Sequence, residues 1–549
     1  MHRKRDSHGV IIAGRVLLAL AGAGALSAEL AWVSSGFHSL QDWPSDLGCL
    51  AIGGGLMAAI WRALRCEAPP GWLGKLLLIA AALRLALSVA WFTALPVFGH
   101  GSPAETAGYV MADAHDRDQA AWKLAKSDRP LLSAFQGYKR VDQYGGMLFL
   151  SALAYRLLNP AKHQPLIIAA LASMVSAITV LISWAMARRA WGLIPAAIAA
   201  LGTAFYPEAV LLGSSQMREA FLMPLAAGAF YGLLVYAQER KAQGLVWGGA
   251  AVTLSVPFSP PTAGLMLGCL GLTALAFPGL YAQHRQQPKS RSLSPWLIAA
   301  GLTILVLIGV WLTLRQYAPA KITNPIALLG WWLEKSADWQ TFLSRQASGW
   351  MQKIFNNTPQ WMHIPLLLLY GSAQPFLPAA LVAYSDAPIW SWIVIWRAAG
   401  WTLLLPLLIY APLQAFRKGS DWFARGLILP IWVSILVSAF RGGSDLWDNP
   451  RYRLVFISIQ LALAAWSWVE QRRSQDRWLG RLGVGIGVML AWFLPWYLRR
   501  YTAFTWPVVD LFKTLGLGIA TAFLYAIWDW ARTAPTLNAN DRGKNQTSS

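Results

Sequence analysis

The chain has 549 residues, of which 56% are hydrophobic and only 13% are charged. Soluble globular domains carry about twice that charged share, so the composition excludes an ordinary soluble protein. Apolar runs of about 20 residues recur from end to end, and each is long enough to cross a bilayer. Backbone groups in lipid must be satisfied within their own segment, which requires helices, and the alternating pattern of a membrane barrel is absent. We therefore predict an all-α fold, a polytopic transmembrane helical bundle.

The formal charge of +21 does not indicate nucleic-acid binding. Most Lys and Arg residues fall in short gaps between apolar runs, which is typical of anchoring to an anionic cytoplasmic leaflet. Membrane lipids are therefore expected partners, and nucleic acid is not. Cys49, Cys66 and Cys269 show neither a disulfide framework nor zinc-binding spacing.

The apolar pattern predicts about 14 spans. Arg3, Lys4 and Arg5 precede a first run that is too long for a signal-peptide core, so we expect an uncleaved first helix that starts in the cytoplasm. Threading from there places the loops rich in Lys and Arg inside, with both termini cytoplasmic, in a membrane that we expect to be the bacterial inner (plasma) membrane. The predicted spans are 10–32, 47–64, 74–96, 165–187, 191–212, 218–237, 243–257, 261–280, 295–315, 389–413, 425–440, 453–469, 479–498 and 507–530.

One apolar segment, 365–384, is not counted, because counting it would reverse the sides of all later loops. Its Gly371–Pro375 interruption favours a re-entrant element at the outer face. Long loops on a rigid scaffold usually carry function, and two such loops are predicted on the outer side. The resulting parts are two extra N-terminal transmembrane helices in 1–73, a transmembrane core at 74–470 with outer loops at 97–160 and 316–388, C-terminal transmembrane helices in 471–532, and a disordered cytoplasmic tail at 533–549.

The first outer loop holds three aspartates, Asp113, Asp116 and Asp118. A helix is expected to begin at Asp116, capped by an aspartate, which would place Asp118, Trp122 and Ala125 on one face. An acidic side chain held at the membrane surface could act as a general base. The competing interpretation, which the loop sequence alone favours, is a solvated helix whose aspartates only cap it and pair with neighbouring basic residues.

Four short stretches stand out along the chain: Asp118 with Trp122 and Ala125, Tyr144–Leu158, Tyr206–Pro224 with Glu208, Arg218 and Glu219, and Asp448–Arg453. Together they resemble the GT-C class of polytopic membrane glycosyltransferases, and more particularly its dolichyl-phosphate-mannose mannosyltransferase-like branch. No single stretch is specific, but their order and their predicted outer placement match the class, over roughly residues 75–470. Ser255–Pro261 stands where related sequences often have an Arg-Pro pair.

The resemblance implies transfer of a sugar from a polyprenyl-phosphate carrier to a glycan, lipid or protein acceptor on the outer face. Asp118, with Asp116 and Asp113 competing for the role, would activate the acceptor hydroxyl. Arg451 and Arg453, with Tyr452 between them, would bind the donor phosphate, because guanidinium groups grip phosphate bidentately. Their outer location breaks the positive-inside rule, as does that of Arg441, Arg499 and Arg500; for the last two we expect snorkelling to headgroups.

Other charged and aromatic residues are further candidates: Arg218, Glu219, Glu208 and Trp122. Glu208 and Arg218 could equally form a structural ion pair. Arg84 and Arg397 lie deeper, and we expect them against carbonyl groups or an acidic neighbour such as Glu29 or Asp510.

No cofactor is firmly indicated, and His100, His115 and His163 lack metal-ligand spacing. The three loop aspartates would suit a divalent cation, so metal use stays open. Two other functions fit the same residues. One is a transporter or flippase of lipid-linked saccharide, and the other is an envelope-glycan polymerase or ligase.

Overall fold

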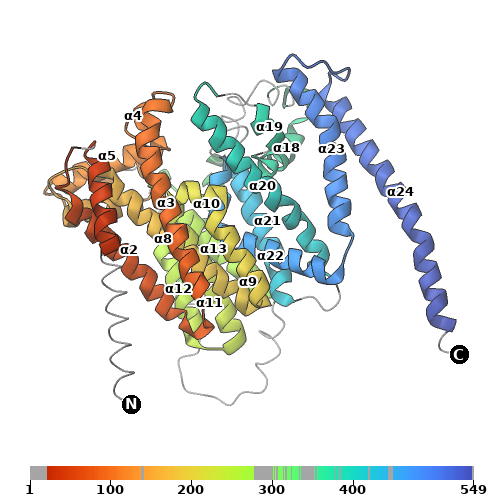
Figure 1. The fold of residues 1–549 in the computed structure, drawn as a ribbon, viewed down its shortest axis with the longest axis horizontal. Coiled ribbons are helices and arrows are strands. Elements are labelled where there is room, and N and C mark those ends of the chain that lie inside the picture. The colour runs from red at the N-terminus through yellow and green to blue at the C-terminus, as the bar shows by residue number, and fades with distance from the viewer. Residues whose placement is uncertain are drawn as a thin grey trace.

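The structure is a computed structural model in which every described element is helical (Figure 1). It describes residues 21–546 except 37, 138–140, 277–300, scattered positions in 302–333, 336–351, 353–354, 376, 383–384, 418–420 and 443–448.

Nine helices within the described residues are long and apolar enough to cross a membrane, which identifies an integral membrane protein. Each follows an apolar run predicted from the sequence. They are α2 (Trp43–Ala63), α3 (Gly71–Phe98), α8 (Pro165–Trp191), α11 (Glu219–Glu239), α20 (Pro388–Ala415), α21 (Trp422–Gly442), the span Arg451–Ser474 formed by the end of η4 (Asn449–Phe456) and α22 (Ile457–Ser474), α23 (Trp478–Tyr501) and α24 (Leu511–Gln546).

The predicted count of 14 spans is not confirmed. The segments at 243–257 and 261–280 form α12 (Ala242–Ser255) and α13 (Pro260–Leu275), which have only 14 and 16 residues. The run at 191–212 is a pair of helices, α9 (Leu193–Phe205) and α10 (Pro207–Gly213), bent by 52° at their junction. The predicted spans 10–32 and 295–315 lie wholly or partly outside the described residues.

The bend between α9 and α10 has a covalent cause and an electrostatic support. Pro207 has no N–H, so the carbonyl of Thr203, four residues earlier, loses its helical partner. The buried guanidinium of Arg84 on α3 replaces that donor, because Nη2 lies 3.0 Å from the oxygen of Thr203 and Nη1 lies 3.2 Å from that of Ala204. The expectation that Arg84 packs against carbonyl groups is therefore confirmed, and its acidic alternatives are not needed.

The apolar segment 365–384 is broken into α18 (Gln360–Ala373) and α19 (Leu377–Val382) around Gln374 and Pro375. The loop at 97–160, which we predicted to lie on the outer side, is folded as a layer of helices: α4 (Pro103–Thr106), α5 (Ala112–Lys126), η2 (Leu131–Ser133), α6 (Ala134–Gly137) and α7 (Gly146–Leu158).

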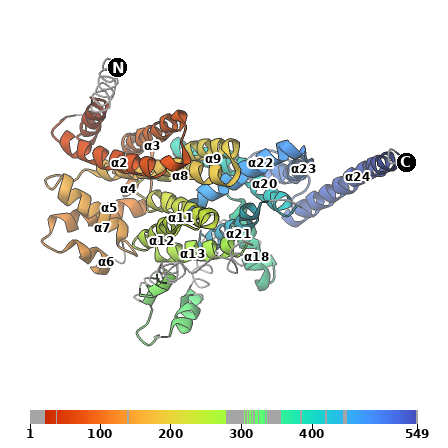
Figure 2. The same ribbon diagram turned by 90° about the horizontal axis from the view of Figure 1, so that it is seen from below.

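Polar contacts define the two ends of the bundle. At one end, α5 and α7 meet the start of α8, the turn after α10, and η4; we call this the α5 end. At the other, Arg189 near the end of α8 pairs with Glu67 and Glu239; we call this the Arg189 end. Helix α24 stands apart from the bundle beside α23 and runs on to Gln546, through most of the tail where we expected disorder (Figures 1 and 2).

Helices α8 and α11 form the centre of the bundle. In the apolar stretch of each helix, 94% and 89% of the residues are buried. Close helix approach in a membrane requires small residues, and α11 meets α12 through three glycines. A Cβ on Gly232 would lie 2.6 Å from the carbonyl oxygen of Gly244 and 2.9 Å from Cα of Gly248. These two helices can therefore pack this closely only while their contact is free of side chains.

The glycine contact gives a stability prediction. We expect G232A to lower the melting temperature in detergent, because overpacking against backbone costs about 1–3 kcal/mol. G268A is the matched control, since a Cβ on Gly268 in α13 would meet nothing within 4 Å. Size-exclusion thermostability assays would measure both. Equal melting temperatures for the two variants would contradict the packing described here.

Candidate active site

Helix α5 carries all three predicted aspartates and begins earlier than we predicted. Its first residue is Ala112 and its N-cap is Met111, which makes no side-chain cap, so the expected start at Asp116 with an aspartate cap is wrong. Asp113 and Asp118 are five residues apart, which is about 140° around an α-helix. The two carboxylates therefore face different neighbours.

Asp118 is buried and held by three donors. Its carboxylate lies 2.6 Å from Tyr109 Oη, 2.7 Å from Tyr155 Oη and 2.6 Å from His163 Nε2. Burial, and then the Asp118 charge, raise the pKa of Tyr109 and of Tyr155 well above the usual value, so both hydroxyls keep the protons they donate. Trp122 lies on the same face and stacks on His163. This arrangement anchors α5 to α7 and encloses the Asp118 carboxylate among three donors.

Asp116 and Asp113 are both more exposed, and they differ in their partners. The Asp116 side chain is 66% exposed and contacts only its neighbour His115, at 3.1 Å. The Asp113 side chain is 49% exposed and lies 3.2 Å from Nη2 of Arg451. Of the three aspartates, Asp113 is therefore the one that the fold brings to a predicted phosphate-binding arginine.

Arg451 and Arg453 point in different directions. They lie in η4, a 3₁₀ helix, where successive side chains are about 120° apart, so residues i and i+2 cannot share one face. The Arg453 guanidinium is buried over the ring of Trp401, 3.3 Å from its centroid, and Nη1 donates to the carbonyl of Gln374 at 2.6 Å. Arg453 thus belongs to the interior of the bundle.

Glu208 is the acidic partner in that interior. Its carboxylate lies 2.7 Å from Nη2 of Arg397 and 3.9 Å from Nη2 of Arg453. The alternative pairing of Glu208 with Arg218 is not what the structure shows, because Arg397 and Arg453 are the cations beside this carboxylate. Two buried guanidinium groups share this carboxylate beneath η4.

Further cations and two tyrosines surround Arg451. Its Nη2 lies 3.0 Å from Tyr452 Oη, and the Arg441 guanidinium lies over the Tyr452 ring at 5.9 Å. The Arg218 guanidinium lies over the Tyr144 ring at 5.1 Å. Burial raises the pKa of Tyr144, and the positive charges of Arg218 and Arg441 oppose that rise, which places both guanidinium groups near this phenol. We call Arg218, Arg441, Arg451, Tyr144 and Tyr452 the cationic cluster.

Sequence reasoning missed part of this cluster. Arg441 had a signal, since it breaks the positive-inside rule, and Tyr144 opens one of the matching stretches. Nothing in the sequence shows that they meet, because they are about 300 positions apart. Glu219 follows Arg218 at the start of α11 and is buried, with Oε2 lacking a hydrogen-bond partner among the described residues.

The described part of the chain contains no assembled set of metal ligands. No group of three His, Cys, Asp or Glu side chains converges there. Asp118 faces away from Asp113 and is held by Tyr109, Tyr155 and His163, so the three-aspartate cation set considered from the sequence is not formed.

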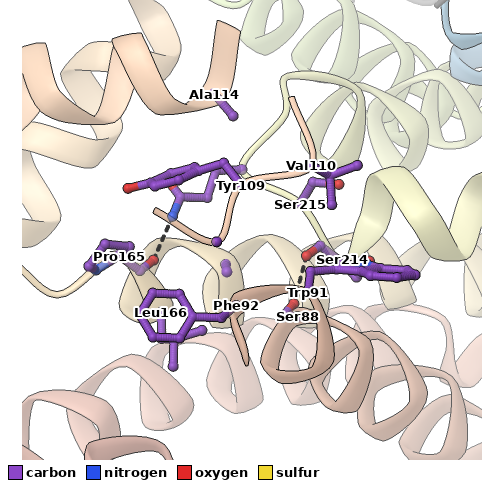
Figure 3. Close-up of a pocket in the computed structure, with 13 residues that line it drawn as sticks. Ser88, Trp91, Phe92, Tyr109, Val110, Ala114, Pro165, Leu166, Ser214 and Ser215 are labelled. Carbon is purple, nitrogen blue, oxygen red and sulfur yellow. Dashed lines mark hydrogen bonds between the residues drawn. The ribbon is translucent and has the colours of Figure 1, made fainter. Parts of the chain in front are cut away.

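A small cavity lies beside Tyr109, between α3, α5, α8 and the turn after α10 (Figure 3). Its volume is about 30 Å³, which is enough for a water molecule but not for a sugar. Ser88, Ser214 and Gln216 supply its polar lining. The cavity therefore belongs to the packing of the outer layer and not to substrate binding.

No protein-family model matches the chain, and no curated protein matches it. The solved structures to which the chain is similar include those of the oligosaccharyltransferase of Archaeoglobus fulgidus. The archaeal enzyme AglB in complex with an inhibitory peptide and a dolichol-phosphate has a TM-score of 0.40 at 13% identity, over 83% of this chain and 54% of that one. The complex with Zn and sulfate gives 0.41 and 12%, over 81% and 53%. The chain spans about half the length of these proteins.

The Asp118 contacts predict a structural role that can be measured. We expect D118N to lower the melting temperature, because an amide cannot accept all three hydrogen bonds and each bond to a charged group contributes about 1.5–3 kcal/mol. D116N, at an exposed position on the same helix, should leave it unchanged. An unchanged melting temperature for D118N would show that the three contacts do not hold the loop.

Proposed function

We propose that the chain is a membrane glycosyltransferase that moves a sugar from a polyprenyl-phosphate carrier to an acceptor at the outer face. The observation that carries the proposal is the Asp113–Arg451 contact of 3.2 Å, which joins a half-exposed carboxylate to the cationic cluster. A glycosyl donor of this kind needs a cationic site for its phosphate and a proton acceptor for the incoming hydroxyl. Both chemistries lie side by side at the α5 end.

The donor phosphate is assigned to the cationic cluster. Arg218, Arg441 and Arg451 keep their charge at any physiological pH and can bind phosphate oxygens bidentately. Tyr452 adds a hydroxyl next to Arg451. Arg453, which the resemblance places in this role, lies in the interior with Glu208 and Arg397, and there it supports η4 and adds positive potential beneath the site.

The proposed reaction breaks one bond, forms one bond and transfers one proton. The bond between the sugar anomeric carbon and the phosphate oxygen breaks, and its electron pair stays on the phosphate, whose negative charge rises against the guanidinium groups. The acceptor oxygen forms the new bond to the anomeric carbon, and its proton passes to Asp113. Asp113 suits this step better than Asp118, whose carboxylate is enclosed by Tyr109, Tyr155 and His163.

The outer location follows from charge. Arg188, Arg189 and Lys241 lie together at the Arg189 end, where Arg188 donates to the carbonyl of Ala68 and Lys241 pairs with Glu239. The positive-inside rule places that end in the cytoplasm. The α5 end then faces outward, where a carrier-linked sugar can meet a glycan, lipid or protein acceptor. Membership of the dolichyl-phosphate-mannose mannosyltransferase-like branch is the finer proposal, in a bacterial plasma membrane.

A transporter or flippase of lipid-linked saccharide is the second candidate, and one observation favours it. The bend between α9 and α10 lies next to the buried Glu208, and broken helices with interior charges are typical of transporters. Flux of a lipid-linked sugar in proteoliposomes, without glycosyl transfer, would support this function. A polymerase or ligase would share the donor and face, and product length on a gel would identify it.

Replacing the two central residues tests the transferase proposal. In membranes supplied with labelled polyprenyl-phosphate sugar and acceptor extract, D113N should reduce transfer about 10²-fold or more, the usual contribution of a general base. R451Q should weaken donor binding by about tenfold or more, because a charge-assisted contact is lost.

D116N is the matched control for D113N, since it removes a carboxylate from the same helix outside the cluster. It should transfer sugar at the rate of the unmodified protein. If D113N and R451Q also keep that rate while the unmodified protein is active, the assignment of these residues is wrong.

A further inference from the structure

Arg117 is a buried arginine with no place in the proposed reaction. It lies one helical turn after Asp113 on α5, and its side chain is only 2% exposed. Burial, and then the Arg218 charge, lower its pKa, while Asp142, Asp113 and Glu219 oppose that change. A charged group removed from water this completely needs partners, so its contacts indicate what it holds in place.

Its first contact reaches the turn before α11. Nη1 of Arg117 donates to the carbonyl of Gln216 at 3.3 Å. Gln216 is two residues before Arg218, and its side chain also donates to the carbonyl of Pro165 at 2.7 Å. The turn that presents Arg218 is therefore fixed to α5 and to the start of α8.

Its second contact reaches the loop before α7. Nε of Arg117 lies 3.7 Å from Oδ2 of Asp142. Asp142 in turn accepts the backbone N–H groups of Tyr144 at 3.3 Å and Leu148 at 3.0 Å. The Asp142 carboxylate therefore sets the conformation of the loop that carries Tyr144, the ring beneath Arg218.

We propose that Arg117 is the positioning residue of the cationic cluster, and this role rests on the proposed function. One guanidinium connects three segments that each contribute a site side chain: Asp113 on α5, Tyr144 before α7 and Arg218 before α11. The planar fork reaches a carbonyl and a carboxylate at once, which a lysine ammonium cannot do from one point. Arg117 itself stays away from the ligand because its side chain is buried.

Arg156 offers a matched control. It also ties α7 to α5, but at the far end of α5, where Nη2 donates to the carbonyls of Leu124 at 3.1 Å and Ser127 at 2.9 Å. Loss of Arg156 removes a similar set of contacts from the same layer, but at the end of α5 that lies away from Asp113. The R156Q variant therefore shows how much binding affinity is lost when the helical layer of α5 and α7 is loosened and Arg117 is kept.

The test measures binding of farnesyl phosphate, a short polyprenyl phosphate, to the detergent-solubilised full chain by calorimetry. Melting temperatures accompany each variant. We expect R117Q to lose about tenfold or more in affinity, as for loss of a charge-assisted contact. R117K should recover only part of that loss, because it restores the charge without the fork. R156Q should bind like the unmodified protein even where its melting temperature falls as far as that of R117Q.

Each remaining outcome contradicts a defined claim. If the unmodified protein binds and R117Q binds equally well, the positioning role is wrong and the proposed function stands. Full recovery in R117K would show that only the charge matters, and an equal loss in R156Q would show that only layer stability matters. Either would overturn the positioning role. A failure of the unmodified protein to bind would overturn the proposed function and this role together.

Discussion

The structure depends on one constraint, which is that a guanidinium group inside a membrane protein must find oxygen partners within the chain. Arg84 meets it with the carbonyls freed by Pro207, and so fixes the bend between α9 and α10. Arg397 and Arg453 meet it with Glu208, which lies on α10 just after that bend. The bend, η4 and α20 are thus joined through a few buried charges, and η4 is the element that presents Arg451.

Helical periodicity then separates residues that look equivalent in the sequence. Asp113 and Asp118 belong to one acidic stretch, but the turn of α5 sends one toward Arg451 and the other toward Tyr155. Arg451 and Arg453 belong to one short motif, but η4 sends one toward Asp113 on α5 and the other toward Trp401 inside the bundle. In each pair one residue is available for chemistry and the other supports the structure that places it.

Hydropathy and charge were enough to predict the membrane class and the position of most helices, since both follow from the cost of burying polar groups in lipid. The predicted count of 14 spans is not confirmed within the described residues, where α12 and α13 are apolar but short. Our preference for Asp113 over Asp118 as the proposed base could not have been reached from the sequence. The enclosure of Asp118 depends on Tyr109, Tyr155 and His163, which meet only in the folded outer layer. The interrupted segment around Gln374 was visible, but its contact with Arg453 was not.

An experimental structure of the full chain in a lipid nanodisc, determined with a bound polyprenyl phosphate, would test the central claim most directly. The account predicts phosphate density against the guanidinium groups of Arg451 and Arg218, with the Asp113 carboxylate beside it. Density bound elsewhere, with Asp113 and Arg451 far apart and no opening between them, would contradict it.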